Sequence, residues 1–251
     1  MARGLTRLVA AAPVVVAMIV LFLAWQIGAT LFGLPTYILP RPFEIVANAL
    51  ANAPLFGGAL AVTASETILG FLLGAAIGLA LAIAMILAPP LESALIPLVV
   101  AINLAPSVAF VPLALIWFGL GIASKIALAA LAMSFVVLLN ALAGLKRPDA
   151  EAINLLRSIG AGPLGILWRL QLPAAMPSLV TGLRVGLARC AIVVIVAEML
   201  GAYSGLGQII YQSTAQLDTL NVWAAVFIAS LSSLLLYAVL VAVDRKLVWW
   251  R

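Results

Sequence analysis

Few residues in this sequence are of the types that catalyse reactions or bind metal ions. Its 251 residues include no histidine, which is the commonest metal ligand and general base. The single cysteine, Cys190, lies in an apolar run, so there is neither a CxxC metal pair nor a disulfide framework. No GxSxG or HExxH run occurs, and no Gly-Lys pair, which a phosphate-binding loop requires. The sequence therefore argues against an enzyme, and neither a metal nor a nucleotide site is expected.

Ionisable residues inside apolar runs are the remaining candidates for chemistry. A charge at the centre of a membrane helix costs about 2.5–3.5 kcal/mol on insertion scales, so each one needs a reason. Glu66 and Glu198 fall near the outer ends of expected spans, where this cost is small, and Arg184 can snorkel from an inner end. Arg189 lies deepest. Three explanations stay open for it: a structural ion pair, contact with a substrate, or snorkelling to the inner surface.

Arg189 is the centre of a candidate translocation path. A guanidinium stays protonated in any protein setting, so it needs a carboxylate, backbone carbonyls, water or an anionic cargo. Glu198 is nine residues further on, nearly on the opposite helical face, which makes Glu66 the better partner. We expect Arg189 to line the path and to favour an anionic or strongly polar substrate. Glu66 and Glu198 are further candidates for this path, and weaker ones of the same polar kind are Asn103, Ser107 and Asn140.

The composition places these residues in a membrane protein. Apolar residues make up 66% of the sequence and charged residues 8%, with a mean hydropathy of +1.28, whereas a soluble domain averages about 45–50% apolar and about 25% charged. At about 20 residues per span, the sequence predicts an all-α polytopic protein, about six transmembrane helices in one domain of residues 1–251. The expected spans are 13–32, 61–88, 93–118, 126–145, 178–200 and 222–243.

Basic residues mark one side of the expected bundle as cytoplasmic. With the N-terminus inside, that side collects nine Lys and Arg, against Arg41 and Lys125 on the other. This asymmetry follows the positive-inside rule and puts both termini in the cytoplasm. The net charge of +5 is therefore no sign of nucleic-acid binding. The nine are Arg3, Arg7, Lys146, Arg147, Arg157, Arg169, Arg245, Lys246 and Arg251.

Glycine and proline predict departures from simple spans. Gly70, Gly74 and Gly78 repeat every four residues, which predicts close approach of a neighbouring helix, within the chain rather than in a dimer. Three prolines interrupt the third stretch and predict a kinked or broken helix, of the kind that can line a pathway. Residues 202–221, on the outer side, combine Gly and Ser with apolar residues. A re-entrant segment and a plain surface loop both stay open there.

The largest polar interruption is residues 146–173, on the cytoplasmic side by the charge argument. Residues 149–159 can form a short helix that Gly160 ends, and a second short helix is expected at 164–170. Two helices are not needed merely to reverse the chain. We therefore interpret this loop as a docking surface.

The spacing within this loop resembles a motif of binding-protein-dependent ABC importers. Their permeases carry a cytoplasmic loop that reads EAA, three residues, Gly, nine residues, Ile, one residue, Leu-Pro. Here nine residues follow Gly160, Leu170 replaces the isoleucine, and Leu172-Pro173 completes the pattern.

The acidic position of that motif departs from the family, because it falls on Asn154. Glu151 lies three residues earlier, on the same helical face. Either Glu151 supplies the charge from one turn back or the ATPase groove accepts Asn154. The resemblance implies that the residues which couple the permease to its ATPase are Glu151, Asn154, Gly160, Leu172 and Pro173.

Further runs narrow the resemblance to nitrate/sulfonate/taurine-type permeases, a group that includes importers of thiamine-pyrimidine and riboflavin precursors. These runs are LPRP at 39–42, the segment from Pro106 through WFGLG at 117–121 to SK at 124–125, and AEM at 197–199 followed by SGLG at 204–207. The resemblance covers nearly the whole chain. It implies a type I ABC importer fold in the bacterial inner membrane.

The resemblance also implies a role and partners. The chain is expected to be the permease of an importer that moves a small polar or anionic solute delivered by an extracytoplasmic binding protein. Its loop helix would dock into an ABC ATPase, whose closure switches a permease dimer, expected to be of identical copies, between inward- and outward-facing states. ATP and Mg²⁺ would bind the ATPase, and this chain would need no cofactor. The rival is a secondary transporter or channel, but the spans hold few acids and no paired set.

Overall fold

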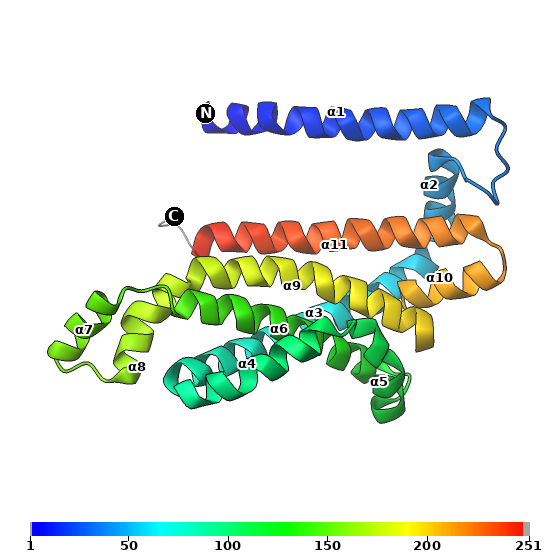
Figure 1. The fold of residues 1–251 in the computed structure, drawn as a ribbon. Coiled ribbons are helices and arrows are strands. Elements are labelled where there is room, and N and C mark those ends of the chain that lie inside the picture. Colours follow the sequence, from blue (N-terminus) through cyan, green and yellow to red (C-terminus); the bar gives the residue numbers. More distant parts are fainter. Residues whose placement is uncertain (1, 248–251) are drawn as a thin grey trace.

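The computed structural model describes residues 2–247, and all regular secondary structure over these residues is helical (Figure 1). Long helices alternate with short ones that connect or break them, as expected for an all-α membrane protein. The elements are α1 (Ala2–Leu31), α2 (Pro42–Ala51), α3 (Ala53–Leu87), α4 (Pro89–Leu104), η1 (Ser107–Phe110), α5 (Val111–Phe118), α6 (Ile122–Leu145), α7 (Ala150–Ser158), α8 (Pro163–Ile166), η2 (Leu167–Gln171), α9 (Leu172–Gly201), α10 (Leu206–Ala215) and α11 (Thr219–Leu247).

All six expected spans fall on helices, but not all form a single straight one. Among the described residues, four helices are long and apolar enough to cross a membrane: Ala53–Leu87, Ile122–Leu145, Pro163–Gly201 and Thr219–Asp244. The third stretch would make a fifth only as a bent pair, α4 with η1–α5. The first lies in α1, where the apolar part with described side chains is the shorter Val16–Leu31. The described residues thus support four or five spans, against the six expected.

Glycine determines how closely α3 and α6 pack. A Cβ on Gly74 would lie 2.5 Å from the Ala130 carbonyl oxygen and 2.6 Å from Met133 Cβ, and Gly70 and Gly78 meet α6 equally closely. The expected intramolecular contact is confirmed. Figure 1 shows α3, α6 and α9 side by side, and their buried apolar residues form the centre of the bundle.

The chain breaks where the prolines predicted it. Helix α4 ends at Leu104, Ala105 is extended, and the following η1–α5 segment turns by 91°. Pro106 forms the N-cap of η1, and a proline donates no backbone hydrogen bond that could continue the helix. The expected broken helix is confirmed.

The two ends of the bundle carry different short helices. Figure 1 shows α7 and α8 at the end where α1 begins and α11 finishes, while α2 and α10 lie at the opposite end. This agrees with the expectation that the termini and the 146–173 loop share one side. Of the nine basic residues assigned to that side, Arg251 lies outside the described residues, and only the backbone of Arg3, Arg7, Arg245 and Lys246 is described.

Residues 202–221 form no plain surface loop. Half of the segment is helix α10, whose Leu206, Ile209 and Ile210 are buried in a cluster with α2, α3 and α11. Apolar residues on one face give this short helix a reason to pack against the bundle. One face of α10 is covered by protein, as the re-entrant interpretation requires, while Tyr203, Tyr211 and Leu217 are exposed.

Candidate coupling surface and polar clusters

Two short helices project from one end of the bundle. Helix α7 ends in a Schellman turn: Gly160 N–H donates to the Arg157 carbonyl and Ala161 N–H to the Leu156 carbonyl, both at 2.9 Å. Gly160 has φ +84°, a left-handed conformation that glycine adopts without strain. The expected turn between the two helices is therefore present.

The second short helix leads directly into the bundle. Helix α8 continues through the π-helical turn η2 into α9, so that residues 163–201 form one uninterrupted helix. The fifth span was expected to begin at 178, and it begins earlier because Pro173 and Pro177 lie within this helix without breaking it. Leu172 is half-buried at the start of α9, with Pro173 exposed beside it. Any displacement of α8 is thus carried to α9 through continuous helix.

The exposed side of this loop combines charged and large apolar residues. Glu151 and Asn154 are both exposed on α7, in which no residue is buried. Such apolar exposure beyond the spans is typical of a surface that a protein partner covers. The large apolar residues exposed here are Leu155, Ile159, Leu164 and Trp168.

A buried lysine occupies the opposite end of the bundle. Lys125 was expected to be a surface charge, but its side chain is 0% exposed. Its Nζ donates to the carbonyls of Leu120 and Gly121, which follow α5, and of Gly201, which ends α9. The ammonium group therefore satisfies carbonyls in the α5–α6 connection and at the C-terminal end of α9. A positive charge is stabilising at the C-terminal end of a helix.

Glu198 accepts hydrogen bonds at the start of α10, whereas Lys125 donates them at the end of α9. Its Oε2 accepts from Gly207 N–H and its Oε1 from the Thr63 hydroxyl, both at 2.7 Å. A Cβ on Gly205 or Gly207 would lie within 2.7 Å of atoms of Glu198, which explains the glycines of the SGLG run. The carboxylate thus joins α9, α3 and α10.

Glu66 belongs to the same cluster, at the end of the bundle opposite α7 and α8, where the sequence placed both glutamates. Both carboxyl groups are buried there, since Glu66 and Glu198 are 2% and 1% exposed. The Glu66 carboxyl adjoins that of Glu198, and its Oε2 has no hydrogen-bond partner among the described residues. The SK, AEM and SGLG runs of the resemblance contain Lys125, Glu198 and the two glycines, but no pattern in the sequence indicated that Glu66 joins them.

Two ion pairs at the other end were also missed. Arg184 does not snorkel but pairs with Asp244 of α11, which is buried. Lys146, at the end of α6, pairs with Glu92 at the start of α4. Both pairs join helices that are far apart in the sequence, and no local pattern indicates them.

Arg189 makes neutral contacts instead of an ion pair with Glu66. Its guanidinium donates to Asn103 Oδ1 at 3.0 Å and to Ser107 Oγ at 3.4 Å. Glu66 is ruled out as partner because it lies beside Glu198, about 13 Å further along α9. The structure therefore unites three of the path candidates beside the break after α4. Asn140 stays apart, donating to its own helix and packing against Gly182.

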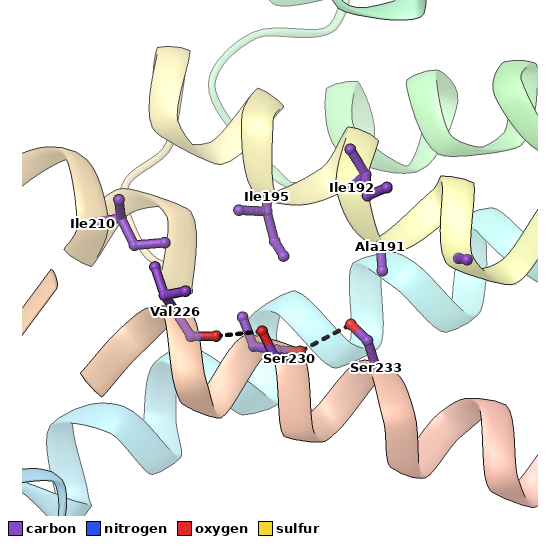
Figure 2. A pocket seen from close by; sticks show the side chains of 9 residues that line it. Ala191, Ile192, Ile195, Ile210, Val226, Ser230 and Ser233 are labelled. Atoms are coloured by element: carbon purple, nitrogen blue, oxygen red, sulfur yellow. Dashed lines mark hydrogen bonds between the residues drawn. The ribbon is translucent and has the colours of Figure 1, made fainter. Parts of the chain in front are cut away.

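An apolar groove of about 340 Å³ lies between α9 and α11 (Figure 2). The hydroxyls of Ser230 and Ser233 donate to carbonyls of their own helix, at Val226 and Ala229. The groove wall is otherwise formed by Ala191, Ile192, Ile195 and similar side chains. It offers no free donor to a polar solute, which separates it from the Arg189 cluster.

Comparison with known proteins identifies the family. Residues 74–249 match the family described as "Binding-protein-dependent transport system inner membrane component". This chain is an ABC importer permease. It is accordingly a multi-pass inner-membrane protein and a non-catalytic subunit, with ATPase and binding-protein partners and no cofactor of its own.

Relatives match the permease over nearly its whole length. It is 32% identical to the "Formylaminopyrimidine transport permease protein ThiX" of Halalkalibacterium halodurans, over 93% of each chain. It is 37% identical to the "Riboflavin transport system permease protein RibX" of Chloroflexus aurantiacus, over 94% of this chain and 88% of that one. It is 32% identical to the "Taurine transport system permease protein TauC" of Escherichia coli, over 92% and 86%.

The fold of the permease has also been seen in a solved structure. A chain of the inward-facing MetNI methionine ABC transporter superposes with a TM-score of 0.53 at 20% identity, covering 75% of this permease and 95% of that chain. At this identity the likeness shows the fold alone. It confirms the expected ABC importer permease architecture.

Proposed function

We propose that residues 146–173 are the surface through which this permease couples to its ATPase. The observation that carries the proposal is mechanical: α8, η2 and α9 form one helix from the projecting loop into the bundle. Glu151 and Asn154 are exposed on α7 for contact, and Gly160 sets the angle between α7 and α8. Leu172 and Pro173 lie at the start of α9, where a displacement of α8 would pass into the bundle.

The coupling proposal is tested by Gly160→Glu in the permease co-expressed with its ATPase. A side chain at φ +84° strains the turn and reorients α7. We expect ATPase co-purification or transport-coupled hydrolysis to fall about tenfold, while the permease still inserts. Gly162→Glu is a matched control, since Gly162 has an ordinary φ of −74° and open space around it.

Two further substitutions distinguish the acidic contact on α7. If Glu151 supplies the charge, Glu151→Lys weakens ATPase binding more than Asn154→Ala does, because it reverses a charge instead of removing an amide. Equal, negligible effects of these two and of Gly160→Glu would show that this loop is not the contact.

We further propose that two identical copies form the translocation path between them. At the α3–α6 contact the glycines leave no space even for an added Cβ, which supports a route beside the bundle and not through it. The Arg189 cluster lies by the break after α4, where Leu104, Pro106 and Val108 are exposed in the single chain. The mass of the purified complex measures the stoichiometry.

The cargo proposed for this importer is a small polar or anionic solute, of the sulfonate, nitrate, taurine or vitamin-precursor class. The names of the relatives support this range, since they include a taurine, a riboflavin and a formylaminopyrimidine permease. The cargo specificity of the cognate binding protein tests it directly.

We propose the orientation with both termini and α7–α8 in the cytoplasm, because basic residues concentrate at that end. A reporter fused after Lys146 should then be cytoplasmic, and one inserted at Gln216, after α10, should be external. Reversed labelling of the two sites contradicts both this orientation and the coupling surface.

A further inference from the structure

Arg189 carries a positive charge that its protein partners do not neutralise. Asn103 and Ser107 accept its hydrogen bonds, and both side chains are neutral. They orient the guanidinium without compensating its charge. Arg184, five residues earlier on the same helix, is compensated by Asp244. The contrast indicates that the charge of Arg189 is left for something outside the chain.

Every acidic side chain of the sequence is accounted for elsewhere among the described residues. All eight acidic residues of the sequence lie among the described residues, and none of the ion pairs found there involves Arg189. Three acids, Glu44, Glu92 and Asp244, pair with other basic residues. Glu198 and Asp218 accept hydrogen bonds from other groups, and Glu66 adjoins Glu198. The last two, Asp149 and Glu151, lie at α7.

The same three side chains hold unused hydrogen-bond donors. A guanidinium has five N–H groups, and that of Arg189 makes two bonds. The amide nitrogen of Asn103 and the hydroxyl of Ser107 donate to no acceptor among the described residues. A positive charge surrounded by free donors matches the oxygens of an anion. It does not match a cation or an apolar group.

We propose that Arg189, Asn103 and Ser107 form a subsite for the oxyanion group, such as a sulfonate or carboxylate, of the transported solute. This rests on the proposed function, because the subsite lies at the break after α4, beside the proposed path. The cargo would exchange its hydration shell for these donors on entering the membrane. The Arg189 subsite thus favours anionic over neutral or cationic cargo.

The test uses Ser107→Cys in a Cys190→Ala background, in the complete importer reconstituted in nanodiscs. The thiol is labelled with an anionic (ethylsulfonate) or a cationic (trimethylammonium) methanethiosulfonate. The measured quantity is the ratio of the two rates, which is independent of the thiol's own reactivity. We expect the ratio of the anionic to the cationic rate to be about tenfold higher at this thiol than at free glutathione. A guanidinium roughly 6 Å away in water attracts the one reagent and repels the other by energies that together give about this factor.

Removing the charge should abolish the preference. Arg189→Gln is expected to return the ratio to that of glutathione, while the charge-neutral control Arg184→Gln/Asp244→Asn keeps it. Should Arg189→Gln fail to assemble, protection of the Ser107→Cys thiol by methanesulfonate but not by tetramethylammonium gives the same answer. No reaction with either reagent would show a site covered by lipid or protein and would overturn the proposal, as would a ratio indifferent to Arg189. If a complex that gives either of these two results still assembles and hydrolyses ATP, the protein is still an importer permease and only the subsite proposal fails.

Discussion

Gly74→Ala is expected to destabilise the permease by about 2–3 kcal/mol, because α3 and α6 cannot accommodate a methyl group between them. The nearest atoms are the Ala130 carbonyl oxygen and Met133 Cβ, at 2.5 and 2.6 Å. Backbone atoms cannot move aside as a flexible side chain can. The measurement is the melting temperature of the purified permease in detergent, read as loss of monodisperse protein.

Gly57→Ala is the matched control for this prediction. Gly57 lies on the same helix, α3, and a Cβ there would meet nothing within 4 Å. The change should be neutral or should stabilise the helix by about 0.5–1 kcal/mol, since alanine is the better helix former. Equal melting temperatures for the two variants would contradict the glycine-packed interface.

Lys125→Met is expected to cost about 3 kcal/mol or more, with the loss concentrated at the end of the bundle that carries α10. The variant leaves the carbonyls of Leu120, Gly121 and Gly201 without their charged donor in a buried site. The nearby Glu66 and Glu198 also lose an attractive charge. Melting temperature measures the global loss. Proteolytic cleavage within 202–221 measures the local one.

The matched control is Lys146→Met, at the other end of the same helix. Lys146 is exposed and pairs with Glu92, and such surface pairs contribute about 0–1 kcal/mol. Its removal should change the melting temperature little and leave 202–221 resistant. If the two lysines behave alike, the buried ammonium is not what holds the α5–α6 connection to the end of α9.

Features that depend on neighbours in the sequence were predictable. Apolar runs long enough to span a bilayer became helices, the prolines broke the third stretch, and Gly160 ended α7. Each follows from hydropathy or backbone conformation within a few residues. The four-residue glycine spacing also predicted a close helix contact, although not that the partner would be α6.

The partners of the charged residues were not predictable in this way. Charge and helical phase predicted Glu66 as the partner of Arg189. In the fold Glu66 lies beside Glu198, and Arg189 donates hydrogen bonds to Asn103 and Ser107. Lys125 was counted as a surface charge, and the fold buries it. The charge of a residue and its position on the helix indicate which partners suit it. They do not say which helices lie together.

The sequence by itself determined that this is a helical membrane protein and where its helices break, and it predicted the surface that docks to the ATPase. These properties are written in hydropathy, in backbone chemistry and in the spacing of a local motif. Only the tertiary structure decided which polar groups meet inside the bundle. Glu198 accepts from a hydroxyl 135 positions away and Arg189 donates to an amide 86 positions away. Buried polar groups must find partners, but the fold, through helices crossing at particular depths, selects which ones they find.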